Sequence, residues 1–358
     1  MLLHFQLRNT ITGVRPMGQR ISAVLRRTFH GSMIVAAAMT LTATRGVADQ
    51  VPHVVASIQP LHGLVSAVMN GVGEPDLLVP PGASPHGFAL RPSDAHSLSR
   101  ADLVFWVGPG IEGFLERPLD GLARDSKVVA LGALPDLHRL PVREGGSFDA
   151  HDHDHGHEQG HGDHDGDHDH AKHEHGGHDH EKHETDEELE PHVWLETHNA
   201  ELMVQAIAAA LSDADPAHAA TYRRNAEAFA GRLDALAGEL HEVLEPFENR
   251  PAIVFHDAYQ HFEKQFHLRV VGSITINPEV PPGARQVSRL RSKIRDLGVR
   301  CVMAEPQFDG HLVEGLIADL PVRAGTADPL GAAVPAGPDH YPQMMRRLAA
   351  GFADCLTD

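Results

Sequence analysis

The sequence predicts an α/β fold with two lobes, each built on a mostly parallel sheet flanked by helices and joined by a long connecting helix. Short β-branched runs alternate with helical stretches from residue 51 onward, and the same alternation returns after Pro251. Such alternation is typical of parallel sheets with helices on both faces. The length of 358 residues favours two domains, and 42% hydrophobic residues are enough for packed cores.

The first 48 residues form a segment that is basic and then apolar. They hold six arginines and no acidic residue, and residues 33–42 have the length of a signal-peptide hydrophobic region. That run is too short to span a membrane, which needs about 20 residues. We therefore predict a signal peptide over 1–48 that is cleaved near Ala48, and a soluble periplasmic protein without direct membrane insertion. Its removal takes away six positive charges and changes the formal charge from −19 to −25.

The N-terminal lobe is predicted to occupy residues 49–215. Helices are expected at 61–70 and 92–99, and strands at 53–57, 76–79, 101–107 and 127–131. The composition then changes over 149–190, which hold 13 His, 16 Asp or Glu and two Lys. Such a segment cannot bury enough apolar surface to offset the entropy of ordering it, so we predict a disordered loop inserted in this lobe.

The connecting helix is predicted over 216–246, where Asp215 and Pro216 give a helix-start signal. A helix of about 28 residues is about 42 Å long at 1.5 Å per residue, which is more than one lobe needs. The C-terminal lobe is predicted over 250–358, and its strands are expected at 252–255, 268–272, 299–304 and 322–325.

The charge balance and the cysteine count exclude several classes of protein. Lys and Arg total 30 against 49 for Asp and Glu, and aromatic residues are 5%, so neither a basic surface nor stacking platforms for nucleic acid are expected. Only Cys301 and Cys355 are present, which excludes Cys-rich zinc folds and iron–sulfur clusters. In an oxidising compartment we expect the two to pair, with two buried free thiols as the alternative.

Four polar residues follow apolar runs, at positions where open α/β sheets bind ligands. His86 and His192 belong to the first lobe, and His256 and Asp328 to the second. Three imidazoles and one carboxylate suit Zn²⁺, a borderline cation that takes four ligands. The chain also holds 29 His, and imidazole is the commonest metal-binding side chain. Spacing alone leaves each residue open to a capping or surface role.

Several local motifs make the metal-site hypothesis specific. They are Ala56-Ser57-Ile58-Gln59-Pro60-Leu61, Gly82-Ala83-Ser84-Pro85-His86, Leu90-Arg91-Pro92-Ser93-Asp94, His192-Val193-Trp194-Leu195, Phe255-His256-Asp257-Ala258-Tyr259, Ala304-Glu305-Pro306-Gln307-Phe308 and Asp328-Pro329-Leu330-Gly331. From about residue 51 to 355 the chain resembles the solute-binding proteins of zinc ABC importers, the ZnuA-like branch of the TroA-like (cluster A-I) metal-binding family. A loop rich in His and acidic residues before the second ligand is typical of that branch.

The resemblance implies that His86, His192 and His256 bind Zn²⁺, with Asp328 or water as the fourth ligand. Manganese-binding relatives have Glu where His256 stands, and a third imidazole favours zinc. Some zinc relatives have Glu before the first ligand, where Pro85 stands here, so no carboxylate comes from that position.

Three nearby residues are given other roles. We expect Glu305 to support the site or the fold rather than to bind metal. We expect His261 to lie on the surface, one helical turn after Asp257, and His62 to stand at a helix start.

The resemblance further implies a monomer that captures periplasmic Zn²⁺ and delivers it to the membrane permease of an ABC transporter. The His-rich loop would be an auxiliary segment that binds or senses zinc with low affinity. Two other hypotheses remain. One is a metallohydrolase, although no His-Glu-x-x-His motif or nucleophile elbow occurs, so no enzyme is expected. The other is a zinc buffer built around the loop alone.

Overall fold

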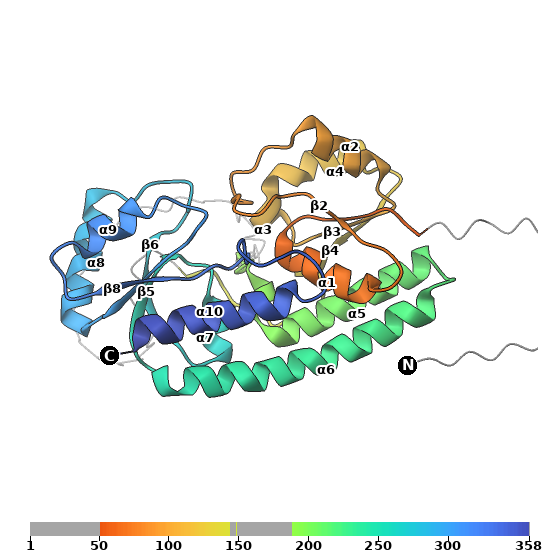
Figure 1. Cartoon of the computed structure of the whole chain (residues 1–358). Helices are drawn as coiled ribbons and strands as arrows, with labels where there is room; N and C mark the ends of the chain where they lie inside the picture. The colour runs from red at the N-terminus through yellow and green to blue at the C-terminus, as the bar shows by residue number, and fades with distance from the viewer. Residues whose placement is uncertain (1–50, 144–147, 149–187, 358) are drawn as a thin grey trace, which may run out of the picture. The chain divides into compact units, whose positions relative to one another are not determined.

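A computed structural model describes residues 51–143, 148 and 188–357, so the predicted signal peptide and nearly all of the predicted loop lie outside the described residues. Two four-stranded sheets, each flanked by helices, confirm the predicted fold class (Figure 1). All strand pairs within them are parallel. None of the helices within the described ranges is long and apolar enough to cross a membrane.

The first sheet has the strand order β2-β1-β3-β4. Its strands are β1 (Val54–Ala56), β2 (Asp76–Leu77), β3 (Leu103–Trp106) and β4 (Lys127–Ala130). All residues of β1 and β3 are buried, as expected for β-branched runs covered on both faces. Its helices are α1 (Gln59–Met69), α2 (Pro92–Arg100), α3 (Pro109–Glu112) and α4 (Glu116–Leu122).

The second sheet repeats this topology with the order β6-β5-β7-β8. Its strands are β5 (Pro251–His256), β6 (Arg269–Thr275), β7 (Cys301–Ala304) and β8 (Arg323–Thr326). Its helices are α7 (Gln260–Gln265), α8 (Ala284–Leu297), α9 (His311–Ile317) and α10 (His340–Leu356). In both sheets the strand order changes direction next to the first strand, between β1 and β3 and between β5 and β7. Open parallel sheets bind ligands at the carboxyl ends of the strands at such a point.

Two long helices connect the sheets. They are α5 (Thr197–Ala214) and α6 (Ala219–Leu244), and α6 packs against α1, α5 and α10. The helix α6 begins at Ala219, three residues after Pro216, where the sequence places its start. In the turn before it the Asp215 carboxylate accepts the His218 backbone N–H at 3.3 Å and the Tyr222 hydroxyl at 2.7 Å, and it lies 2.7 Å from the His218 ring.

One hydrophobic core runs through both lobes, and a smaller core lies under the outer helices of each. The shared core includes residues of β1, β3, α5, α6, β5 and α10. One smaller core includes Leu98 and Leu119 from α2 and α4, and the other Leu290 and Leu316 from α8 and α9. Cys301 and Cys355 form the expected disulfide, which ties β7 to α10 with a Cα–Cα distance of 5.4 Å.

Candidate metal centre

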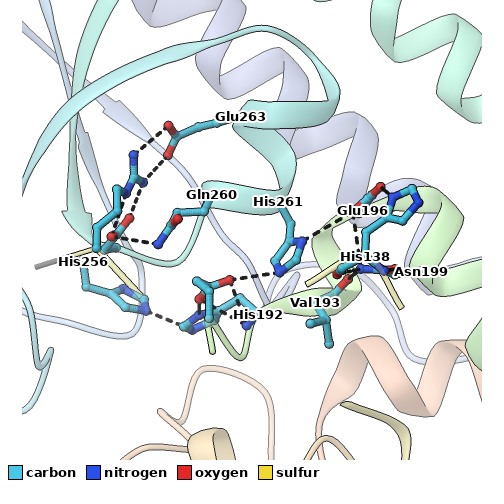
Figure 2. A network of polar contacts seen from close by, with 12 residues as sticks. His138, His192, Val193, Glu196, Asn199, His256, Gln260, His261 and Glu263 are labelled. Carbon is cyan, nitrogen blue, oxygen red and sulfur yellow. Dashed lines mark hydrogen bonds and ion pairs between the residues drawn. The ribbon is translucent and has the colours of Figure 1, made fainter. Parts of the chain in front are cut away.

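Three of the four predicted ligand residues meet at one point. His86 lies in the loop after β2, His192 directly precedes the short 3-10 helix η3 (Val193–Leu195), and His256 ends β5. One ring nitrogen from each lies within 4.8 Å of the other two, and no further His, Cys, Asp or Glu side chain of the described ranges joins this group. His192 and His256 point toward each other, with 3.3 Å between their Nε2 atoms (Figure 2).

A buried carboxylate holds the other ring nitrogen of two of these imidazoles. Glu190 Oε1 lies 2.5 Å from His192 Nδ1, and Glu305 Oε1 lies 2.7 Å from His256 Nδ1. An ionised carboxylate only accepts, so Nδ1 carries the proton of each ring when Glu190 and Glu305 are ionised. Each Nε2 therefore presents a lone pair to the centre of the group, which is the tautomer that binds metal. Glu305 thus supports the site, as the sequence predicts.

Burial and mutual repulsion keep most of the group neutral. Burial, together with the neighbouring imidazoles His192 and His256, lowers the pKa of His86 to about 3. Burial, together with the neighbouring imidazoles His256 and His261, holds the pKa of His192 well below its usual value. Burial opposes charge on His256 as well, but the Glu305 carboxylate outweighs it and raises the pKa of His256. Burial also raises the pKa of Glu190, to about 8.

The structure does not bring Asp328 into this group. Asp328 follows β8, and its carboxylate accepts the Gln307 amide at 2.7 Å. It also accepts three backbone N–H groups, those of Leu330, Gly331 and Ala332. These bonds make Asp328 the cap of its own turn.

His261 is buried, and its prediction as a surface residue is wrong. The helix α7 begins only at Gln260, so counting a helical turn from Asp257 gives the wrong face. The His261 ring is 0% exposed and lies between two carboxylates, 3.5 Å from Glu190 and 3.4 Å from Glu196. Figure 2 shows this row of polar groups continuing from His192 past His261 to Glu196 and His138. His62 lies in the first turns of α1, as predicted, and is buried.

Two residues that support the site were missed at the level of sequence. Glu190 was counted as the last residue of the predicted loop, yet it is 2% exposed. Arg143, six residues before that loop, forms ion pairs with Asp257 and Glu263 and so fixes the position of the residue after His256. Glu190 stands two positions before His192, which is the one signal that could have separated it from the acidic residues around it.

Most of the chain matches one protein family. Residues 54–355 match the family model described as "Zinc-uptake complex component A periplasmic" (ZnuA). The chain belongs to the ZnuA family. Among ZnuA proteins, "High-affinity zinc uptake system protein ZnuA" of Brucella suis biovar 1 is 46% identical over 336 residues, covering 92% of this chain and 99% of the relative. Its namesake in Yersinia pestis is 34% identical, covering 85% of this chain and 91% of the relative.

Solved structures show the same fold. "Crystal structure of ZnuA" superposes with a TM-score of 0.67 at 19% identity, covering 86% of this chain and 100% of the other. "Periplasmic zinc binding protein TroA from Treponema pallidum" gives 0.68 at 19% identity, with the same coverage. A ZnuA deletion mutant "plus zinc bound" gives 0.65 at 19% identity, covering 86% and 99%. The ZnuA family is described as the periplasmic component of an uptake complex and not as an enzyme, which decides against the metallohydrolase hypothesis.

Proposed function

We propose that the chain binds one Zn²⁺ tightly in the periplasm through His86, His192 and His256. The observation that carries this is the convergence of three ring nitrogens within 4.8 Å, two of them with Nδ1 held by buried carboxylates. Neutral imidazoles are borderline ligands that suit Zn²⁺ better than Mg²⁺, Ca²⁺ or Mn²⁺. The curated relatives are named for high-affinity zinc uptake, which agrees with this donor set.

We further propose that residues 1–48 direct export and are removed near Ala48, and that the mature chain acts as a monomer. It would deliver its ion to the membrane permease of a zinc ABC transporter. Membership in a family of uptake components supports this partner. Zinc uptake into vesicles that contain such a permease should require the loaded protein, and uptake that proceeds equally without it would reject the delivery role.

The His-rich segment is proposed as an auxiliary site of low affinity. Its two ends are joined, since Val142 N–H donates to the Glu188 carbonyl and Glu190 N–H to the Leu140 carbonyl, at 2.9 and 2.8 Å. Arg143 and Glu188 line the same cleft as His192 and His256, so the segment starts and ends beside the proposed ligands. Its formal charge of −14 from 16 acids and two lysines would attract cations to that cleft.

Calorimetric titration of the mature chain with Zn²⁺ tests this division. We expect one tight class and a weaker class of several ions, because each flexible arrangement of loop imidazoles must be ordered on binding. Deletion of residues 149–187 should remove the weaker class and leave the tight one. If the deletion removes the tight class instead, zinc binds in the loop and the buffer hypothesis is correct.

A further inference from the structure

Two imidazoles outside the proposed metal centre, those of His138 and His198, lie close together on the surface. Their ring centroids are 4.7 Å apart, and the ring planes are tilted by 35°. The rings of the three proposed zinc ligands are 5.2, 5.5 and 5.6 Å apart, so the surface pair is at least as closely placed. The two side chains are 60% and 48% exposed, which leaves both rings open to an ion from solution.

The fold holds both rings on one frame. His198 stands in the first turn of α5, and the next residue, Asn199, binds the backbone of His138 twice. Asn199 Oδ1 accepts the His138 N–H at 2.8 Å, and Asn199 Nδ2 donates to the His138 carbonyl at 3.1 Å. Asn199 is 0% exposed, so water does not compete for these bonds. The position of His138 on α5 is therefore fixed before any ion arrives.

A carboxylate lies beside the Nδ1 atom of each ring. Glu196 Oε1 is 2.5 Å from His138 Nδ1 (Figure 2), and Glu201 Oε2 is 3.9 Å from His198 Nδ1. Burial opposes charge on Glu196, but hydrogen bonds from His261 and His138 outweigh it and lower the pKa of Glu196. Glu196 is thus ionised at neutral pH, and its carboxylate accepts the Nδ1 proton of His138.

The Nε2 atom of each ring is left to bind a ligand. No other residue of the described ranges forms a hydrogen bond or ion pair with Nε2 of His138 or His198. An imidazole whose Nδ1 donates to a carboxylate presents its Nε2 lone pair, which is the usual arrangement of a metal-binding histidine. Two such rings at this distance offer two nitrogen donors to one ion.

We propose that His138 and His198 form a second metal site, which binds one Zn²⁺ or similar borderline cation through Nε2 of each ring, with water at the remaining positions. Imidazole suits Zn²⁺, Ni²⁺ and Cu²⁺, whereas Mg²⁺ and Ca²⁺ take oxygen ligands. The site is open to solvent and supplies two protein ligands, so it binds more weakly than a buried group of three. It goes beyond the proposed function, because neither the three buried imidazoles nor the His-rich segment takes part in it.

The test is modification of histidines by diethyl pyrocarbonate in the mature full-length chain, followed residue by residue by mass spectrometry. The reagent attacks a free ring nitrogen, so a metal-bound imidazole is protected. Trypsin releases residues 128–139, in which His138 is the only histidine. With Zn²⁺ at about ten times the dissociation constant of the site, both His138 and His198 should react roughly tenfold more slowly, and Mg²⁺ should have no effect.

His311 is the matched control. It is exposed and lies 3.0 Å from the Glu314 carboxylate, but it contacts no second imidazole within the described ranges. Its rate of modification should be unchanged by Zn²⁺. Equal protection of His311 would show that a single imidazole beside a carboxylate is enough, which would overturn the paired site.

The two rings must depend on each other if they share one ion. His198→Ala should therefore abolish the protection of His138, and His138→Ala that of His198. Protection of His138 that survives in His198→Ala at the same Zn²⁺ concentration would overturn the inference, as would full reactivity of both rings when the chain is saturated with Zn²⁺. The protection measured on the unsubstituted chain needs no variant. None of these outcomes bears on zinc binding by the three buried imidazoles.

Discussion

Replacing Glu190 by Gln should weaken zinc binding although the residue is not a proposed ligand. Glu190 is 2% exposed and accepts from His192 twice, at Nδ1 (2.5 Å) and at the backbone N–H (3.1 Å to Oε2). The amide keeps one acceptor oxygen, but its NH₂ then faces a donor. One of these two bonds is lost, and so is the negative charge with which Glu190, once ionised, strengthens His192 as a ligand.

We expect a loss of about 10–100-fold in Zn²⁺ affinity, the usual effect of removing a partner of a metal-binding imidazole. At 1.36 kcal/mol per tenfold, this is roughly 1.4–2.7 kcal/mol of binding free energy. Competition with a chelator of known affinity, on the chain without residues 149–187, measures it. Glu188→Gln is the matched control, since Glu188 is exposed and only two positions away.

The same substitution should leave the metal-free protein no less stable, which separates a binding role from a folding role. Burial raises the pKa of Glu190 to about 8. The free energy of unfolding therefore falls as pH rises from the ordinary value of 4.5 toward 8, because the unfolded chain ionises Glu190 while the native state keeps the proton. Gln does not ionise. Zinc affinity within twofold of the parent, or a large fall in the metal-free melting temperature, would refute the reasoning.

Three other predictions follow from the described contacts. Replacing Cys301 and Cys355 by Ala should lower the free energy of unfolding by about 2–4 kcal/mol in urea, and a loss below about 1 kcal/mol would show that the bridge contributes little. Asp94→Asn should lower the free energy of unfolding by about 1 kcal/mol at neutral pH, because hydrogen bonds from the largely exposed Arg91 outweigh burial and lower the pKa of Asp94. In urea unfolding experiments the difference between the two proteins should vanish as pH falls through that lowered pKa. A difference that stays constant with pH would contradict this prediction. Zinc affinity should fall about tenfold per pH unit below the raised pKa of His256, since zinc must displace that proton, and chelator competition that shows no pH dependence would contradict imidazole ligation.

The strands β1, β3, β5 and β7 could be predicted because they are short apolar runs that the fold buries almost completely. The predicted runs at 101–107 and 299–304, for example, contain β3 (Leu103–Trp106) and β7 (Cys301–Ala304). The disulfide could be predicted because the chain has only two cysteines and an exported protein is expected to pair them in an oxidising compartment. The start of α6 was placed three residues too early, because residues 216–218 form a turn in which Asp215 accepts the His218 backbone N–H before the helix begins.

Within the site, the sequence indicated the imidazoles but not their partners. His86, His192 and His256 stand in distinctive motifs, whereas Glu190 is one acidic residue among 16 in a biased segment. Asp328 accepts the Gln307 amide, a residue 21 positions before it, and this bond forms only in the folded chain. Pairings between distant residues of this kind leave no local pattern.

The central claim is that one zinc ion binds between His86, His192 and His256. Anomalous X-ray scattering at the zinc absorption edge, from crystals of the loaded mature chain, locates the ion directly. Our account predicts one full-occupancy peak about 2.0–2.1 Å from a ring nitrogen of each of the three histidines. A peak coordinated by other residues, with these three imidazoles free of metal, would contradict it.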